Sequence, residues 1–221
     1  MEFVFLPQSF HSGSYTDYKR IRTIFNSNLN EGSNSSIIEL LEITLGSNQL
    51  HHTIVNTTST IVPLVGELNI KLNDQINYSI DPGHLFVLNN TIGDIQIENN
   101  DLHEPVLFLE LKSTFNPPSL SSLIHKIDID QSIQSLNELQ LNASLILSIG
   151  KFVGRHDHEY KLNQTNHVGI YIISGAFEVE YRLMEAGDMM MINDIDKDQL
   201  EFESLAKESI ILILRSTVRI S

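Results

Sequence analysis

The sequence predicts an all-β protein built from two small β-barrels in tandem, and two observations lead to this prediction. The first is an internal repeat: one pattern of apolar strand, glycine, strand, turn and strand occurs over 61–89 and again over 169–193. Such self-similarity is the signature of a repeated structural unit. The second is that short apolar or alternating segments are separated by Asn, Asp, Pro and Gly turn signals throughout the chain. Many short strands of this kind are typical of barrels and sandwiches.

In the first copy, the apolar run 37–45 predicts a strand rich in Ile and Leu. Residues 67–72 alternate strictly between polar and apolar side chains, as a half-buried strand does. These residues end a longer predicted β segment over 59–72, and the remaining strands predicted here cover 85–88, 92–97 and 106–111.

The second copy begins after a connector. Two adjacent prolines at 117 and 118 remove two backbone donors, so no central strand continues through 116–119. The sequence therefore predicts an N-terminal barrel over 1–115, a connector over 116–142 and a C-terminal barrel over 143–221. Within the connector, 130–141 is interpreted as a short helix. The strands predicted in the second barrel cover 144–152, 169–173, 177–181, 189–192, 200–202 and 209–214.

Composition limits the function classes. The chain has 221 residues, no cysteine and 41% hydrophobic residues, so it can bury a core without disulfides. The absence of cysteine also excludes thiolate nucleophiles and zinc–thiolate sites. The net charge of −14 repels phosphate backbones, so we expect no nucleic-acid partner. No apolar stretch is long enough to span a bilayer, and the first residues lack the pattern of a secretory signal, so we expect a cytoplasmic protein without membrane association.

Two segments resemble the pirin family of bicupins, as a divergent branch of it. The first is Asn56-Thr57-Thr58-Ser59-Thr60-Ile61-Val62-Pro63-Leu64-Val65-Gly66-Glu67-Leu68, and the more specific second runs from Gly175 to Asp188, preceded by 149–155. The resemblance covers about 37–215. It implies two tandem cupin barrels of the RmlC-like jelly-roll type. It also implies, in metal-bearing members, one metal site in the N-terminal barrel, and in some members quercetin 2,3-dioxygenase activity.

The residues at the family's metal positions are only partly suitable as ligands. A typical pirin has His-x-His before the first glycine and His-x-Glu on a later strand. By the family's spacing these positions fall on His52 and Ile54, and on Gln96 and Glu98. Three imidazoles and a carboxylate suit an iron-like ion with open positions, whereas Ile54 cannot coordinate and Gln96 is a weak replacement. A one-residue slip in register would bring in His51 instead, on the other face of its strand.

We therefore take His52, Gln96 and Glu98 as the candidate metal ligands. The expected cofactor is either none or a weakly bound divalent metal of the Fe, Ni or Mn type. The alternative is that these side chains bond to one another or to water in a polar cavity that accepts a small molecule. The sequence offers no Gly-x-Ser-x-Gly elbow and no phosphate loop, so we assign no catalytic residue and leave open whether the protein is an enzyme.

A second histidine group, Arg155-His156-Asp157-His158-Glu159, is more visible. His-x-His on a strand places both rings on one side, as some metal sites do. The group lies too far before Gly175 for a cupin ligand pair, so we interpret it as a solvent-exposed loop. The functional expectation is thus a binding module for a small polar or aromatic ligand or for a protein, with a degenerate N-terminal metal site. The alternative is a metal-dependent quercetin 2,3-dioxygenase-like oxygenase.

Overall fold

The computed structural model describes residues 2–6, 12–15, 19–31, 34–55, 58–72, 76–88, 93–113, 124–130, 133–141, 145–162, 167–193, 195 and 197–216. These residues form strands and no helix, which confirms the all-β prediction. The described part of the chain therefore has no helix that is long and apolar enough to cross a membrane. Contacts between residues divide the chain into two units, 12–28 with 36–127, and 1–11 with 29–35 and 128–221. They are called the N-terminal and the C-terminal unit below, and the domain limits expected from the sequence remain a prediction.

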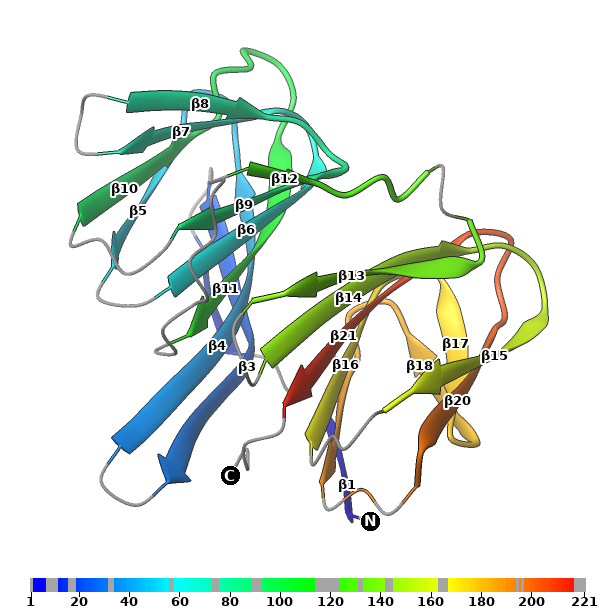
Figure 1. Ribbon diagram of the computed structural model, residues 1–221. Helices are drawn as coiled ribbons and strands as arrows, with labels where there is room; N and C mark the ends of the chain where they lie inside the picture. Colours follow the sequence, from blue (N-terminus) through cyan, green and yellow to red (C-terminus); the bar gives the residue numbers. More distant parts are fainter. Residues whose placement is uncertain are drawn as a thin grey trace. The chain divides into compact units, whose positions relative to one another are not determined.

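The N-terminal unit is a two-sheet jelly roll (Figure 1). A four-stranded sheet has the order β5-β10-β7-β8, and a seven-stranded sheet has the order β12-β9-β6-β11-β4-β3-β2. Their bounds are β2 Ser12–Tyr15, β3 Lys19–Glu31, β4 Asn34–Leu45, β5 Leu50–Val55, β6 Thr58–Val65, β7 Leu68–Leu72, β8 Ile76–Ile80, β9 His84–Leu88, β10 Gly93–Glu98, β11 Val106–Ser113 and β12 Ile124–Lys126. The core between the sheets is apolar, with Ile70 and Ile97 facing Ile43 and Phe108, among others.

The C-terminal unit repeats this arrangement. Its four-stranded sheet has the order β15-β20-β17-β18, and its six-stranded sheet has the order β1-β19-β16-β21-β14-β13. The bounds are β1 Glu2–Leu6, β13 Ser135–Gln140, β14 Leu145–Phe152, β15 His156–Lys161, β16 His167–Ser174, β17 Ala176–Val179, β18 Arg182–Glu185, β19 Met189–Asn193, β20 Gln199–Ser204 and β21 Ser209–Ser216. The orders β5-β10-β7-β8 and β15-β20-β17-β18 match strand for strand. This match confirms the prediction of two like-built barrels.

The glycines of the repeat explain why both copies turn at the same places. Gly66 and Gly175 have φ values of 76° and 77°, and Gly83 and Gly187 have 87° and 90°. A residue with a Cβ adopts such φ values only with strain, so the chain needs glycine at these turns. Because each pair has nearly the same φ, the sequence repeat is also a repeat of backbone conformation.

Two segments differ from the sequence-based interpretation. The connector helix expected over 130–141 is wrong: 135–140 form β13, which pairs antiparallel with β14 along its whole length. A helix this short gains little by itself, whereas an edge strand gains a full hydrogen-bond ladder. The second histidine group is also not a loop, because 156–161 form β15, which pairs with β20. The proline pair at 117 and 118 lies outside the described residues.

Candidate functional site

The expected metal-site residues lie together on one face of the four-stranded sheet β5-β10-β7-β8. In the antiparallel register His52 lies opposite Gln96, and Gln96 lies opposite Lys71. Neighbours of this kind project to the same side of a sheet, and side chains along a strand alternate between its faces. Ile95 and Ile97 of β10 are fully buried in the core. His52 is exposed and Gln96 and Glu98 are half-buried, so this group lies on the outer face of the barrel.

The carboxylate of Glu98 is already engaged on that face. The Lys71 ammonium lies 2.8 Å from its Oε1. The amide of Gln96 donates to the same oxygen. The side chain of Ile54 is not among the described ones. In the described part of the chain no three His, Asp or Glu side chains gather as metal ligands would. Coordination of a metal by His52, Gln96 and Glu98 stays a prediction, and the ion would compete with the Lys71 ammonium for the negative charge of Glu98.

The inner face of the same barrel carries a different polar group, centred on Glu110. This carboxylate on β11 is completely buried. His51, 5% exposed, places Nε2 at 3.1 Å from its Oε2, and Ser59 of β6 donates to its Oε1, also at 3.1 Å. The Lys112 ammonium is 3.6 Å from Oε2. Because His51 belongs to the four-stranded sheet and Glu110 to the seven-stranded sheet, this cluster links the two sheets through the core.

Sequence reasoning missed Glu110, although a signal existed. Glu110 is the single acidic residue in the apolar run Val106-Leu107-Phe108-Leu109-Glu110-Leu111, and a charge inside a core strand needs partners. An ionised Glu110 accepts a hydrogen bond from His51 when Nε2 carries a proton. Nδ1 is buried and has no hydrogen-bond partner among the described residues. One ring nitrogen is too few for a metal site, so this cluster serves to orient His51 and to hold the sheets together.

In the C-terminal unit, His158 is the inward counterpart of His51. It lies opposite Phe202 on β20, and its ring centroid is 4.4 Å from that of Phe152 and 5.3 Å from that of Phe202. Burial lowers the pKa of His158. The neighbouring His156 lowers it further, and Asp157 acts in the opposite direction. The alternation along β15 that turns His158 inward turns Asp157 and Glu159 outward.

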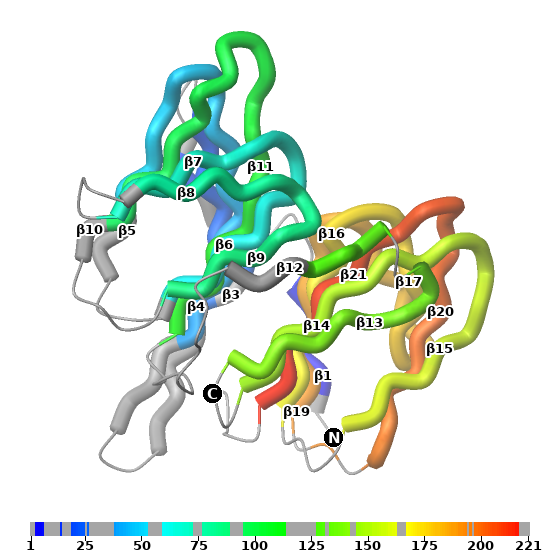
Figure 2. Tube along the Cα trace, turned by 45° about the horizontal axis from the view of Figure 1, so that its top comes forward, coloured from blue at the N-terminus to red at the C-terminus, as the bar shows by residue number. Residues whose placement is uncertain are grey.

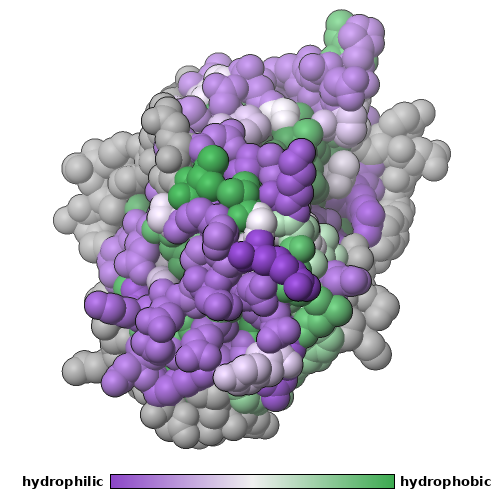
Figure 3. Space-filling view, turned by 90° about the vertical axis from the view of Figure 1, so that its right-hand side faces the viewer, coloured by the Kyte–Doolittle hydropathy of each residue, from purple (hydrophilic) through white to green (hydrophobic). Residues whose placement is uncertain are grey.

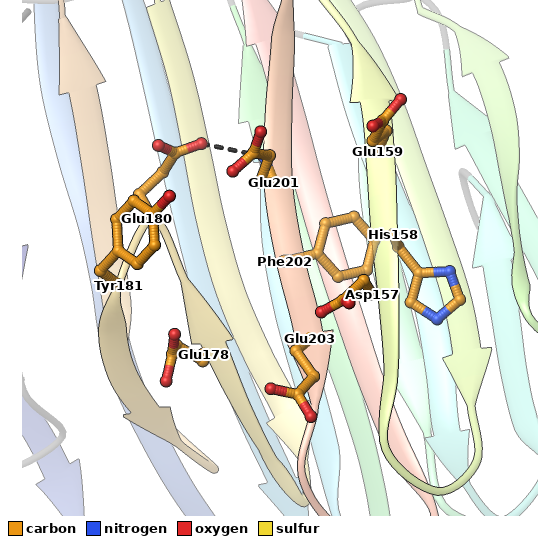
Figure 4. A pocket seen from close by; sticks show the side chains of 9 residues that line it. All are labelled: Asp157, His158, Glu159, Glu178, Glu180, Tyr181, Glu201, Phe202 and Glu203. Carbon is orange, nitrogen blue, oxygen red and sulfur yellow. Dashed lines mark hydrogen bonds between the residues drawn. The ribbon is translucent and has the colours of Figure 1, made fainter.

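The outer face of the sheet β15-β20-β17-β18 carries a shallow acidic groove of about 360 Å³. Figure 4 shows its carboxylates spread along β15, β20, β17 and the turn that follows β17. They belong to Asp157, Glu159, Glu178, Glu180, Glu201 and Glu203. Glu180 is held by the Lys197 ammonium and the Glu201 backbone amide, while Tyr181 beside it is 85% exposed. The face shown in Figure 3 is mostly hydrophilic, with small hydrophobic patches. Six carboxylates in one groove disfavour anionic ligands there.

Comparison with known proteins agrees with this architecture. Residues 132–214 match the family model described as the quercetinase C-terminal cupin domain. The structure of a bacterial pirin, YhhW, from Escherichia coli in complex with nickel(II) superposes with a TM-score of 0.77 at 9% identity. This alignment covers 97% of this chain and 99% of that chain.

A second similar structure is procruciferin, an 11S globulin from Brassica napus, with a TM-score of 0.71 at 8% identity. This alignment covers 100% of this chain and 85% of that chain. No curated protein matches the sequence. At these identities the superpositions establish the fold, and the family model identifies the C-terminal barrel. The C-terminal barrel therefore matches a cupin domain of the pirin type over residues 132–214, and the chain as a whole shares the fold of the bacterial pirin structure.

Proposed function

We propose that this pirin-like bicupin has a degenerate N-terminal metal centre and acts in the cytoplasm as a binding module for a small ligand or a protein. The observation that carries this proposal is the distribution of donors over β5 and β10. The outer faces hold His52, Gln96 and Glu98, and the inner faces hold His51 next to Ile95 and Ile97. Among the side chains described on these two strands, neither face offers the three or more strong donors that a catalytic divalent metal needs.

The contacts of Glu98 on the outer face of the sheet also support this proposal. A divalent metal needs an available carboxylate, yet the Glu98 carboxylate is neutralised by the Lys71 ammonium. The neutral Gln96 amide adds no charge to replace it. The cofactor proposed for this chain is therefore none, or a divalent metal of the Fe, Ni or Mn type bound weakly. The nickel(II) in the Escherichia coli pirin structure makes nickel one of the ions to test.

The rival function is a metal-dependent oxygenase of the quercetin 2,3-dioxygenase type. It needs His52 and Glu98 as ligands, completed by Gln96, His51 or water. Adjacent residues of a strand point to opposite faces, and His51 is buried while His52 is exposed. Both histidines therefore cannot hold one ion without a change of register, which makes this function the second candidate.

Metal analysis of protein purified without an affinity tag tests the proposal. We expect iron, nickel and manganese to total far less than one ion per chain by mass spectrometry, even after incubation with each ion and desalting. We also expect no quercetin turnover above that of the free ion. The reason is that a salt-bridged carboxylate and one exposed imidazole hold a transition metal weakly.

A matched variant shows that the assay can detect a restored site. The double substitution Ile54→His and Gln96→His supplies the family's ligand types, so this variant should retain more nickel than the native chain. Stoichiometric metal in the native protein, lost together with quercetin turnover in a His52→Ala and Glu98→Ala double variant, would instead establish the oxygenase.

The net charge of the chain and its acidic groove indicate which kinds of partner can bind. A chain with a net charge of −14 and an acidic groove repels polyanions. We therefore propose a small polar or aromatic molecule or a protein as the partner, and neither nucleic acid nor a membrane. Mass spectrometry under non-denaturing conditions distinguishes a retained small molecule from a bound protein by the added mass.

A further inference from the structure

Strand β15 forms one edge of the sheet β15-β20-β17-β18, so it has a single neighbour, β20. Figures 1 and 2 show it at the border of the C-terminal unit beside β20. An edge strand of six residues is held by one hydrogen-bond ladder and by the side chains it buries. Its anchors on the inner face are His158 and Tyr160, because the other side chains of 156–161 are exposed.

The anchor His158 lies in an aromatic cluster. Its ring contacts Phe152 of β14 and Phe202 of β20, and these two rings in turn contact Phe177 of β17. The Nε2 atom of His158 is buried and has no hydrogen-bond partner among the described residues. This environment holds a neutral imidazole, whereas an imidazolium there would carry an N–H without an acceptor.

The charges around His158 lie mainly outside this cluster. On its own strand, His156 disfavours protonation and Asp157 favours it. On β20, Glu201 and Glu203 lie opposite Glu159 and Asp157 and line the outer groove. Arg155 reaches Glu203 at 4.0 Å. The nearby Tyr160 hydroxyl bonds to Ser148 at 2.6 Å, and burial raises its pKa, so it stays neutral. In the closed strand a protonated His158 thus lies against aromatic rings on the inner face, while the carboxylates lie on the outer face of the same sheet.

We propose that protonation of His158 releases the edge strand β15, so that the C-terminal barrel opens along this edge as the pH falls. The open strand lets the imidazolium reach water and the carboxylates of the groove. The direction of the pH effect follows from the protons bound by each state. His158 has a lower pKa in the closed state than in the open state, so the open state binds more protons and is favoured as the pH falls. The closed strand is therefore favoured well above pH 6.5 and loses stability as the pH falls below it.

Hydrogen exchange measured by mass spectrometry tests this proposal. We expect the protection of backbone amides in 156–161 to fall by up to about tenfold between pH 7.5 and pH 5.5, after correction for the intrinsic exchange rate. The peptide covering β21, a central strand, serves as the internal reference and should not change. In the variant His158→Phe the aromatic packing is kept and the titrating group is gone, so the pH effect on β15 should disappear.

Two further variants make the result decisive. His156→Gln removes a neighbouring exposed histidine and should leave the pH effect in place. His158→Gln removes the same titration as the Phe variant through a different side chain, and it should also lose the effect. Unchanged protection of β15 in the native chain at both pH values would overturn the proposal. So would an equal pH effect in the native chain and in both His158 variants.

Discussion

Replacing Glu110 by alanine should lower the free energy of unfolding by about 3 kcal/mol, the cost typical of breaking a buried charged pair. The substitution leaves His51 and Ser59 buried without their acceptor. The Lys112 ammonium loses one of its two carboxylates and keeps Glu39 at 3.7 Å. The substitution also removes the polar link between the two sheets of the N-terminal barrel. Urea denaturation followed by circular dichroism measures this loss.

Two controls distinguish the loss of the buried Glu110 contacts from the loss of any carboxylate in this barrel. Glu67→Ala removes an exposed carboxylate of the same barrel and should change stability by less than about 0.5 kcal/mol. A double-mutant cycle of His51→Ala with Glu110→Ala should give a coupling of about 1 kcal/mol or more, since the two side chains are in contact. Additive effects of the two substitutions would show that the contact at 3.1 Å contributes nothing to stability.

Replacing Gly175 by alanine should destabilise the C-terminal barrel by about 3 kcal/mol, the sum of a strained backbone and a steric clash. Gly175 has φ = +77°, and a Cβ there would lie 2.2 Å from Ser209 Oγ and 2.7 Å from the Glu208 carbonyl oxygen. The backbone oxygen belongs to the turn that enters β21 and cannot move without disturbing that strand. Thermal unfolding should show a large drop in the melting temperature.

Gly154 provides a matched control, because it has nearly the same φ of +72° but open space around a Cβ. Gly154→Ala should therefore cost about 1 kcal/mol, which is the conformational strain alone. The difference between the two alanine variants measures the steric part at Gly175. Equal losses in both variants would mean that the close approach of Ser209 and Glu208 does not matter.

Much of the fold follows directly from the sequence. The repeated glycines at 66 and 175, and at 83 and 187, fix the turns by their positive φ values. Strands such as 68–72 and 106–113 follow from local alternation and apolar content, which depend on near neighbours in the chain. These local signals are strong because each strand must place one face on a core.

The candidate site is harder to predict from the sequence than the fold is. Choosing between His51 and His52 requires the pairing register of β5 with β10, and a slip of one residue exchanges the inner and outer faces. The family spacing indicated His52, while the structure turns His51 toward the core and His52 outward. The role of Glu110 depends on side chains brought from β5 and β6, which are distant in the sequence.

The sequence by itself determined two like-built barrels, the turns of each copy and the residue types available for a site. Only the tertiary structure decided which strands close the sheets: β12 pairs with β9 in one unit, and β1 pairs with the equivalent β19 in the other (Figure 2). It also decided which of two adjacent histidines faces the core. Both depend on pairings between distant segments, whose favourable energy exists only after the chain has folded.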